Sequence, residues 1–161
     1  MAADNTDVII EHPNRDKATS KATKAVVILL LLASAGLVLI VTIGGWDATA
    51  GAQPVSLAYA VIYLLMAFYV ARWNRGVLPV SAALAMILGI FAAVSVPGWF
   101  DRNATGYTDP ALDAEILGLV TAIIVPVQVL LIAFAMRGFQ QSWNIEVERL
   151  SDGTTRAMPS H

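Results

Sequence analysis

The chain has 161 residues, of which 57% are hydrophobic and 14% are charged, with a formal net charge of −2. Soluble domains average about 45–50% apolar and about 25% charged residues, so this composition indicates a membrane protein. Cysteine is absent, which excludes disulfide bonds, thiolate metal sites and cysteine nucleophiles. The two histidines, His12 and His161, lie near the chain ends, so no apolar segment offers a histidine to ligate haem.

The first 24 residues form a polar tail that becomes basic toward its end. Lys17, Lys21 and Lys24 are spaced like residues on one helix face, just before the first apolar segment. Basic residues at such a position attract anionic lipid headgroups, each by about 1 kcal/mol near the surface. The alternative is that these lysines only set the orientation of the first segment. Most of residues 1–16 is expected to be disordered.

Four segments without a charged residue follow, and each is long enough to cross a bilayer core of about 30 Å as a helix. The shortest has 18 residues and the longest has 24; the segments are 25–46, 54–71, 77–100 and 116–136. Buried helices of soluble proteins usually keep a polar stripe, which these segments lack. The sequence therefore predicts an all-α polytopic membrane protein, with four transmembrane helices arranged as two hairpins in a bundle over residues 25–136.

The basic residues indicate how these helices are oriented. Nine of the ten lysines and arginines fall on one side of the membrane, in the two tails and in the link between the second and third segments. Arg102 is the single basic residue on the other side. The positive-inside rule then places both termini in the cytoplasm. We expect a bacterial plasma membrane as the location, with the lipid bilayer as the immediate partner.

Small residues recur at helical spacing in the third and fourth segments. Because lipid chains are as apolar as leucine, membrane helices associate through close contact at such positions. These faces are expected to form the internal seam of the bundle, with the seat of a partner subunit as the alternative. The predicted packing residues are Ser81, Ala85, Gly89 and Ala93 in the third segment and Gly118 and Ala122 in the fourth.

The fourth segment contains a proline and a glutamine close together near its middle. Pro126 removes one backbone hydrogen bond and is expected to kink the helix. Gln128 is the most polar side chain in the middle of any segment, and a buried amide needs a partner. The candidate partners are the carbonyl freed by Pro126 and a serine or threonine of a neighbouring helix. We therefore favour a structural role for Gln128 over ligand binding.

Residues 137–150 are interpreted as an amphipathic extension on the cytoplasmic side. Apolar residues recur there at intervals of four, four and three, which is typical of a helix face. This face is predicted to dock lipid or a cytoplasmic partner through Phe139, Trp143, Val147 and Leu150. The fourth helix would continue to near Leu150 or bend onto the membrane surface. Residues 151–161 are expected to form a disordered tail.

The apolar segments carry no ionisable side chain of the kind that intramembrane catalysis, proton relay and ion transport usually need. No nucleotide-binding motif is present. We therefore predict a protein that is not an enzyme, binds no cofactor or metal, and has no nucleic-acid partner. The alternative of an enzyme acting at the membrane surface would depend on Asp101, Arg102 and Asp109.

These features favour an accessory or assembly subunit of a larger membrane complex, and a respiratory complex is one host that would fit. Short loops, small-residue faces and the amphipathic extension support this interpretation, with other membrane-protein subunits as partners. The alternative is a small transporter or channel component. Its pore would need the polar side chains of the segments, namely Ser34, Thr42, Ser56, Ser95, Thr121 and Gln128.

Overall fold

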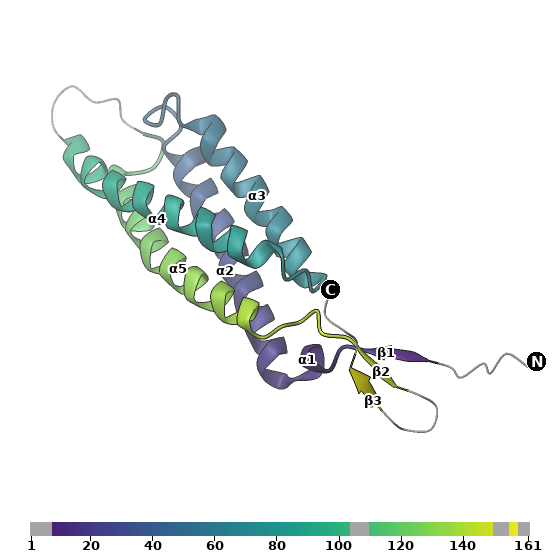
Figure 1. Ribbon diagram of the computed structural model, residues 1–161. Helices are drawn as coiled ribbons and strands as arrows, with labels where there is room; N and C mark the ends of the chain where they lie inside the picture. The colour runs from purple at the N-terminus through teal and green to yellow at the C-terminus, as the bar shows by residue number, and fades with distance from the viewer. Residues whose placement is uncertain (1–7, 104–109, 150–154, 158–161) are drawn as a thin grey trace, which may run out of the picture.

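The computed structural model describes residues 8–103, 110–149 and 155–157, and most of them are helical. Four long helices lie side by side (Figure 1): α2 (Ala18–Gly44), α3 (Gln53–Ala71), α4 (Val77–Phe100) and α5 (Ala114–Gln140). Each is long and apolar enough to cross a membrane. The predicted all-α architecture with four membrane-spanning helices is therefore confirmed.

The helix limits follow the limits of the uncharged segments, with short polar extensions. α4 has the predicted bounds, whereas α2 begins seven residues before its apolar segment and α5 ends four residues after its own. The Asp113 side chain caps the start of α5 by accepting a hydrogen bond from the backbone N–H of Glu115 at 2.9 Å. At the end of α2, the N–H of Gly45 donates to the Val41 carbonyl at 2.9 Å. Capping groups therefore satisfy backbone atoms at both of these ends.

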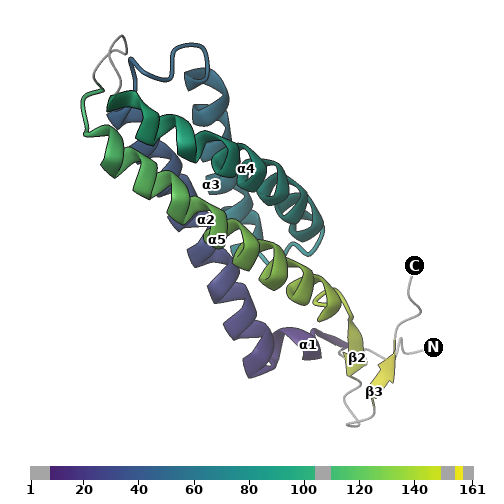
Figure 2. The same cartoon turned by 90° about the vertical axis from the view of Figure 1, so that its left-hand side faces the viewer.

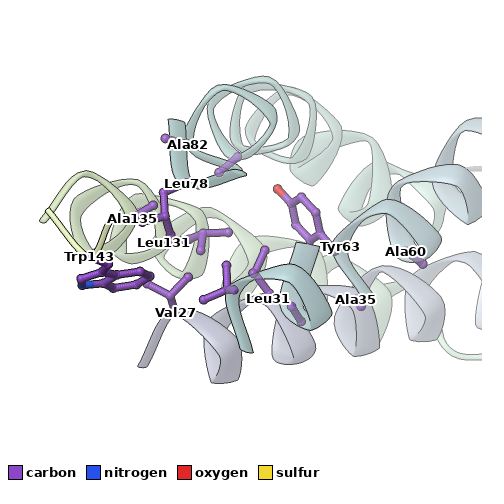
Figure 3. Close-up of a cluster of buried hydrophobic side chains, with 13 residues drawn as sticks. Val27, Leu31, Ala35, Ala60, Tyr63, Leu78, Ala82, Leu131, Ala135 and Trp143 are labelled. Carbon is purple, nitrogen blue, oxygen red and sulfur yellow. The ribbon is translucent and has the colours of Figure 1, made fainter. Parts of the chain in front are cut away.

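The four helices pack unevenly against one another. α4 lies along α5, and α2 contacts both α3 and α5, whereas α3 and α4 touch over only a short stretch. Figure 3 shows the main hydrophobic core, in which Leu31, Tyr63 and Leu131 come from three different helices. Many large apolar side chains on the outward faces are exposed. In a four-helix membrane protein, these outward faces meet lipid.

The two ends of the bundle differ. At one end, named the sheet end here, three short strands form an antiparallel sheet in the order β1 (Ile9–Glu11), β2 (Val147–Arg149) and β3 (Thr155–Ala157). Because β1 pairs with β2, segments from both chain ends meet there (Figure 2). The short helix α1 (Pro13–Asp16) lies between β1 and α2. The other end, named the loop end, holds the α2–α3 connection and the α4–α5 connection, which begins with the 3₁₀ helix η1 (Asp101–Asn103).

The described parts of both tails carry short elements that the sequence did not predict. β1 (Ile9–Glu11) and α1 (Pro13–Asp16) form in the N-terminal tail, and β3 (Thr155–Ala157) forms in the C-terminal tail. The helical extension is also absent from the described residues, because α5 ends at Gln140 and 147–149 form a strand. Ser142 has a φ of 50°, a left-handed conformation that interrupts a right-handed helix. Leu150 lies outside the described residues.

Candidate functional site

A polar network crosses the middle of the bundle. The Tyr63 hydroxyl of α3 donates to Oε1 of Gln128 on α5 at 2.8 Å, and Nε2 of Gln128 donates to the Ser34 hydroxyl of α2 at 2.9 Å. Ser34 donates onward to the Leu30 carbonyl at 2.7 Å. All three side chains are buried. The network therefore joins α2, α3 and α5 at a depth where water offers no alternative partner.

Gln128 thus has a serine of a neighbouring helix as a partner, one of the candidates that the sequence offered. Sequence reasoning missed Tyr63, although a signal existed. Tyr59 and Tyr63 are one turn apart inside an apolar segment, and a buried phenol usually finds a hydrogen-bond partner. Pro126 lies within α5 on an exposed position, and the kink expected there remains a prediction.

The small-residue stripe of α4 lies in the seam with α5 over part of its length. Ser81 and Ala85 are fully buried, and a Cβ at Gly89 would lie 3.4 Å from the Cβ of an α5 side chain. Ala93 is exposed, so its assignment to the seam is wrong; Ala92 is buried instead. In a helix of 3.6 residues per turn, residues four apart differ in direction by about 40° around the helix axis. Over the twelve-residue step from Ser81 to Ala93 the stripe therefore turns by about 120°, away from the seam.

Gly118 lets α5 approach the loop end of α4 closely. A Cβ at this position would lie 3.0 Å from the Phe100 ring and 3.1 Å from the Cβ of Trp99. Ala122, one turn further along α5, is half-buried. Both predicted packing residues of α5 therefore lie on the inner side of the bundle, and Gly118 has no spare space.

Gly118→Leu is expected to lower the free energy of unfolding by about 1–3 kcal/mol, the usual cost of overpacking a filled site. Unfolding of the detergent-solubilised protein, followed by circular dichroism, measures this loss. Gly36→Leu on α2 is the matched control, because a Cβ at Gly36 meets nothing within 4 Å. Equal losses for the two variants would contradict the close approach at Gly118.

An aromatic cluster closes the bundle at the sheet end. Trp143 is fully buried and meets Trp73 edge to face, with ring centroids 5.2 Å apart. The Lys24 ammonium lies 4.0 Å from the Trp73 ring centroid, within cation–π distance. The assignment of Trp143 to a docking face is therefore wrong. The turn at Ser142 points this side chain into the core, where it lies at one end of the cluster in Figure 3.

The other predicted docking residues have different environments. Phe139 is half-buried under the Arg75 guanidinium, whose carbon lies 4.1 Å from the ring centroid and whose Nε donates to the Phe139 carbonyl at 2.6 Å. Val147 is half-buried in β2. The structure therefore does not bring the three described residues of this set, Phe139, Trp143 and Val147, onto one helix face.

Of the three tail lysines, Lys17 and Lys21 are exposed and Lys24 is half-buried beside Trp73. The exposed pair has the charge and position to meet lipid headgroups at the sheet end. Lys24 instead packs against an aromatic ring of the bundle.

Three side chains around α1 fasten the N-terminal segment to the segment after α5; we name this set of contacts the terminal clasp. Asn14 donates to the Ser142 carbonyl and Arg15 donates to the Trp143 carbonyl, each at 3.0 Å. Nε2 of His12 lies 3.1 Å from Oε1 of Glu146. The sheet is therefore tied to the bundle beside the aromatic cluster.

A cavity of about 570 Å³ occupies the loop-end half of the bundle, between α3 and α4; we name it the loop-end cavity. Val38, Tyr59 and Ile124 line its deep end, one helical turn from the polar network. Trp99 and Arg102 line its outer end. Four of the six hypothetical pore residues also line it: Thr42, Ser56, Ser95 and Thr121.

The residues considered for surface catalysis lie at the loop end. Arg102 donates from Nη2 to the Ala48 carbonyl at 2.9 Å, and its guanidinium carbon lies 4.8 Å from the Trp99 ring centroid. Asp101 is exposed in η1, and Asp109 lies outside the described residues. In the described part of the chain, no group of three or more histidine or acidic residues is arranged to hold a metal ion.

Comparison with protein-family models, with curated proteins and with solved structures finds no match. A functional proposal for this protein therefore depends on the geometry of its bundle and its two ends.

Proposed function

We propose that this protein is a non-catalytic accessory or assembly subunit of a larger membrane complex, and that it binds its partner subunit at the sheet end. The supporting observation is the outer edge of β1. In the strand order β1–β2–β3, the outer edge of β1 pairs with no described strand. Ile9 and Ile10 on this strand are 58% and 53% exposed. An extended partner segment added to this edge would bond its backbone and cover both side chains.

Within β1 this edge carries neither lysine nor proline, although Glu11 is charged and the strand has only three residues. Soluble proteins place lysine, proline or bulges on exposed edges to prevent pairing with other chains. Here the preceding Val8 is also exposed, so the apolar stretch covers three residues. The terminal clasp and the aromatic cluster hold the sheet against the bundle. A partner bound at β1 would therefore be fixed relative to the membrane helices.

Orientation is part of the proposal. Most lysines and arginines of the described residues belong to the sheet end, and the positive-inside rule places such an end in the cytoplasm. The partner would then approach from the cytoplasmic side of a bacterial plasma membrane. A respiratory complex remains one host that fits a small subunit of this kind.

The double variant Ile9→Lys/Ile10→Lys is expected to lose the partner, because charges on an edge strand oppose strand addition. The measurement is affinity purification from native membranes in mild detergent, with photo-crosslinking from position 10 to identify the contacting subunit. Ile145→Lys is the matched control, because Ile145 is also at the sheet end, is 50% exposed and lies outside the strands. A wild-type protein that purifies alone and forms no crosslink would overturn the proposal.

The second candidate function is a small transporter or channel component, and the loop-end cavity favours it. Four hydroxyl-bearing residues of the hypothetical pore line this cavity. However, just below the cavity Gln128 is hydrogen-bonded to both Ser34 and Tyr63. A continuous path across the membrane would require this network to open, so we place this function second.

A further inference from the structure

The loop-end cavity has the depth of one membrane leaflet. Its lining on α4 runs from Leu88 to Trp99, a span of twelve residues whose eleven helical rises cover about 16 Å. A bilayer core of about 30 Å gives each leaflet about 15 Å. The polar network lies directly below, because Val38 follows Ser34 by four residues and Ile124 precedes Gln128 by four. The cavity therefore ends near the middle of the membrane.

The cavity faces the lipid between α3 and α4. These two helices are joined at the sheet end and touch over only a short stretch. Their cavity-lining residues toward the loop end include Val55 and Phe91, which are 60% and 63% exposed. Protein interiors are close-packed, so four helices in full contact with one another would leave no such space. The opening thus connects the cavity with the hydrocarbon region of one leaflet.

The lining is apolar in character even where hydroxyl groups occur. Thr42 and Thr121 are buried, and each donates at 2.7 Å to the carbonyl four residues earlier on its own helix. Ser95 does the same at 2.7 Å. These hydroxyl protons are therefore used within the helices. Apolar cavities of this kind do not hold water well and accept apolar molecules instead.

We infer that the loop-end cavity binds one acyl chain of a phospholipid from the adjoining leaflet. The volume of about 570 Å³ lies within the range of small-molecule sites, roughly 300–1,000 Å³. Trp99 and Arg102 lie at the outer end, at the depth where aromatic and basic side chains meet lipid headgroups. A phosphate bound above the chain would lie near the positive charge of Arg102. This inference does not depend on the partner at the sheet end.

The test places the purified full-length protein in nanodiscs that contain a phospholipid with a diazirine at the end of one acyl chain. After irradiation, mass spectrometry maps the labelled residues. Two neighbouring pairs make the comparison: Leu88 and Ile124 line the cavity, whereas Ile87 and Ile123 are 45% and 44% exposed on outward faces. A bound chain is expected to label the cavity residues severalfold more strongly than these neighbours. Stronger labelling of the outward neighbours would overturn the inference.

Gly98→Leu is designed to fill the outer part of the cavity. Gly98 lines the cavity, and a Cβ there meets nothing within 4 Å, so the larger side chain has space. We expect a severalfold loss of label at Leu88 and Ile124, whereas Gly36→Leu, made in equally open space on α2, leaves the label unchanged. If Gly98→Leu does not give a folded protein, Ser95→Leu at the same opening replaces it. Undiminished cavity labelling in a folded filling variant would overturn the inference.

Discussion

Replacing Trp143 with alanine is expected to lower the free energy of unfolding by about 3–5 kcal/mol, the usual cost of truncating a buried tryptophan. The ring is fully buried and packs edge to face on Trp73. It also fills the space above Gly138, where an added Cβ would lie 3.1 Å from the tryptophan ring. The backbone carbonyl of Trp143 accepts the Arg15 bond of the terminal clasp. Loss of the ring therefore removes core packing and loosens the attachment of the sheet.

Two measurements check this result. Thermal unfolding in mild detergent gives the loss of stability, and limited trypsin digestion reports on the sheet end, since cleavage after Arg15 and Lys17 becomes faster when the terminal clasp opens. Trp46→Ala is the matched control, because Trp46 lies at the loop end and its side chain is 46% exposed. Substitutions at exposed positions usually change stability by no more than about 0.5 kcal/mol. Similar losses in both variants would contradict the role assigned to Trp143.

The four helices could be predicted because one physical constraint dominates them. A chain that crosses about 30 Å of hydrocarbon must satisfy its backbone internally and stay apolar over about 20 residues. That constraint is local, so it can be found in a short window of sequence. α4 illustrates this, since its bounds at Val77 and Phe100 coincide with those of the uncharged segment.

The sheet end could not be predicted because its contacts are distant in sequence. Ile9 pairs with Arg149, and each strand has only three residues, too few for a recognisable alternation. Two residues there have positive φ angles: Trp73, within the aromatic cluster, at 61°, and Ser142, next to it in sequence, at 50°. Such conformations in residues other than glycine depend on surrounding packing that holds them in place. The helix-like spacing of apolar residues after α5 therefore does not reveal the turn at Ser142 or the strand β2.

The candidate sites were predictable to different degrees. Gln128 stands out in the sequence, since an amide in the middle of an apolar segment requires a partner. The identity of Tyr63 as its second partner depends on how α3 rotates against α5, which a single segment does not determine. The loop-end cavity depends on the separation of α3 and α4, and no motif encodes that separation. Polar outliers are thus visible in the sequence, whereas spaces between helices require the fold.

Gln128→Leu is expected to lower the free energy of unfolding by about 1–3 kcal/mol, because it leaves the Tyr63 hydroxyl buried without its acceptor. Ser34 is affected less, since its own proton remains bonded to the Leu30 carbonyl. The loss of unfolding free energy in Gln128→Leu comes mainly from the unpaired Tyr63 hydroxyl, so removing this hydroxyl as well recovers part of the loss. The double variant Gln128→Leu/Tyr63→Phe is therefore expected to be more stable than the sum of the two single losses implies.

A double-mutant cycle on the detergent-solubilised protein measures this coupling. Hydrogen bonds between membrane helices average about 0.6 kcal/mol in such cycles, so a coupling above that value would mark the network as stronger than usual. Tyr59→Phe paired with Gln128→Leu is the control cycle, because the Tyr59 hydroxyl lies 3.5 Å from the Leu84 carbonyl and does not contact the amide. Additive losses for the Tyr63 and Gln128 variants would mean that the two side chains do not stabilise each other, which would contradict the role of the network in closing the bundle below the cavity. Coupling in the Tyr63 cycle together with none in the Tyr59 cycle would show that the Tyr63–Gln128 hydrogen bond holds α3 to α5 below the cavity. A continuous route through the membrane would have to break this bond.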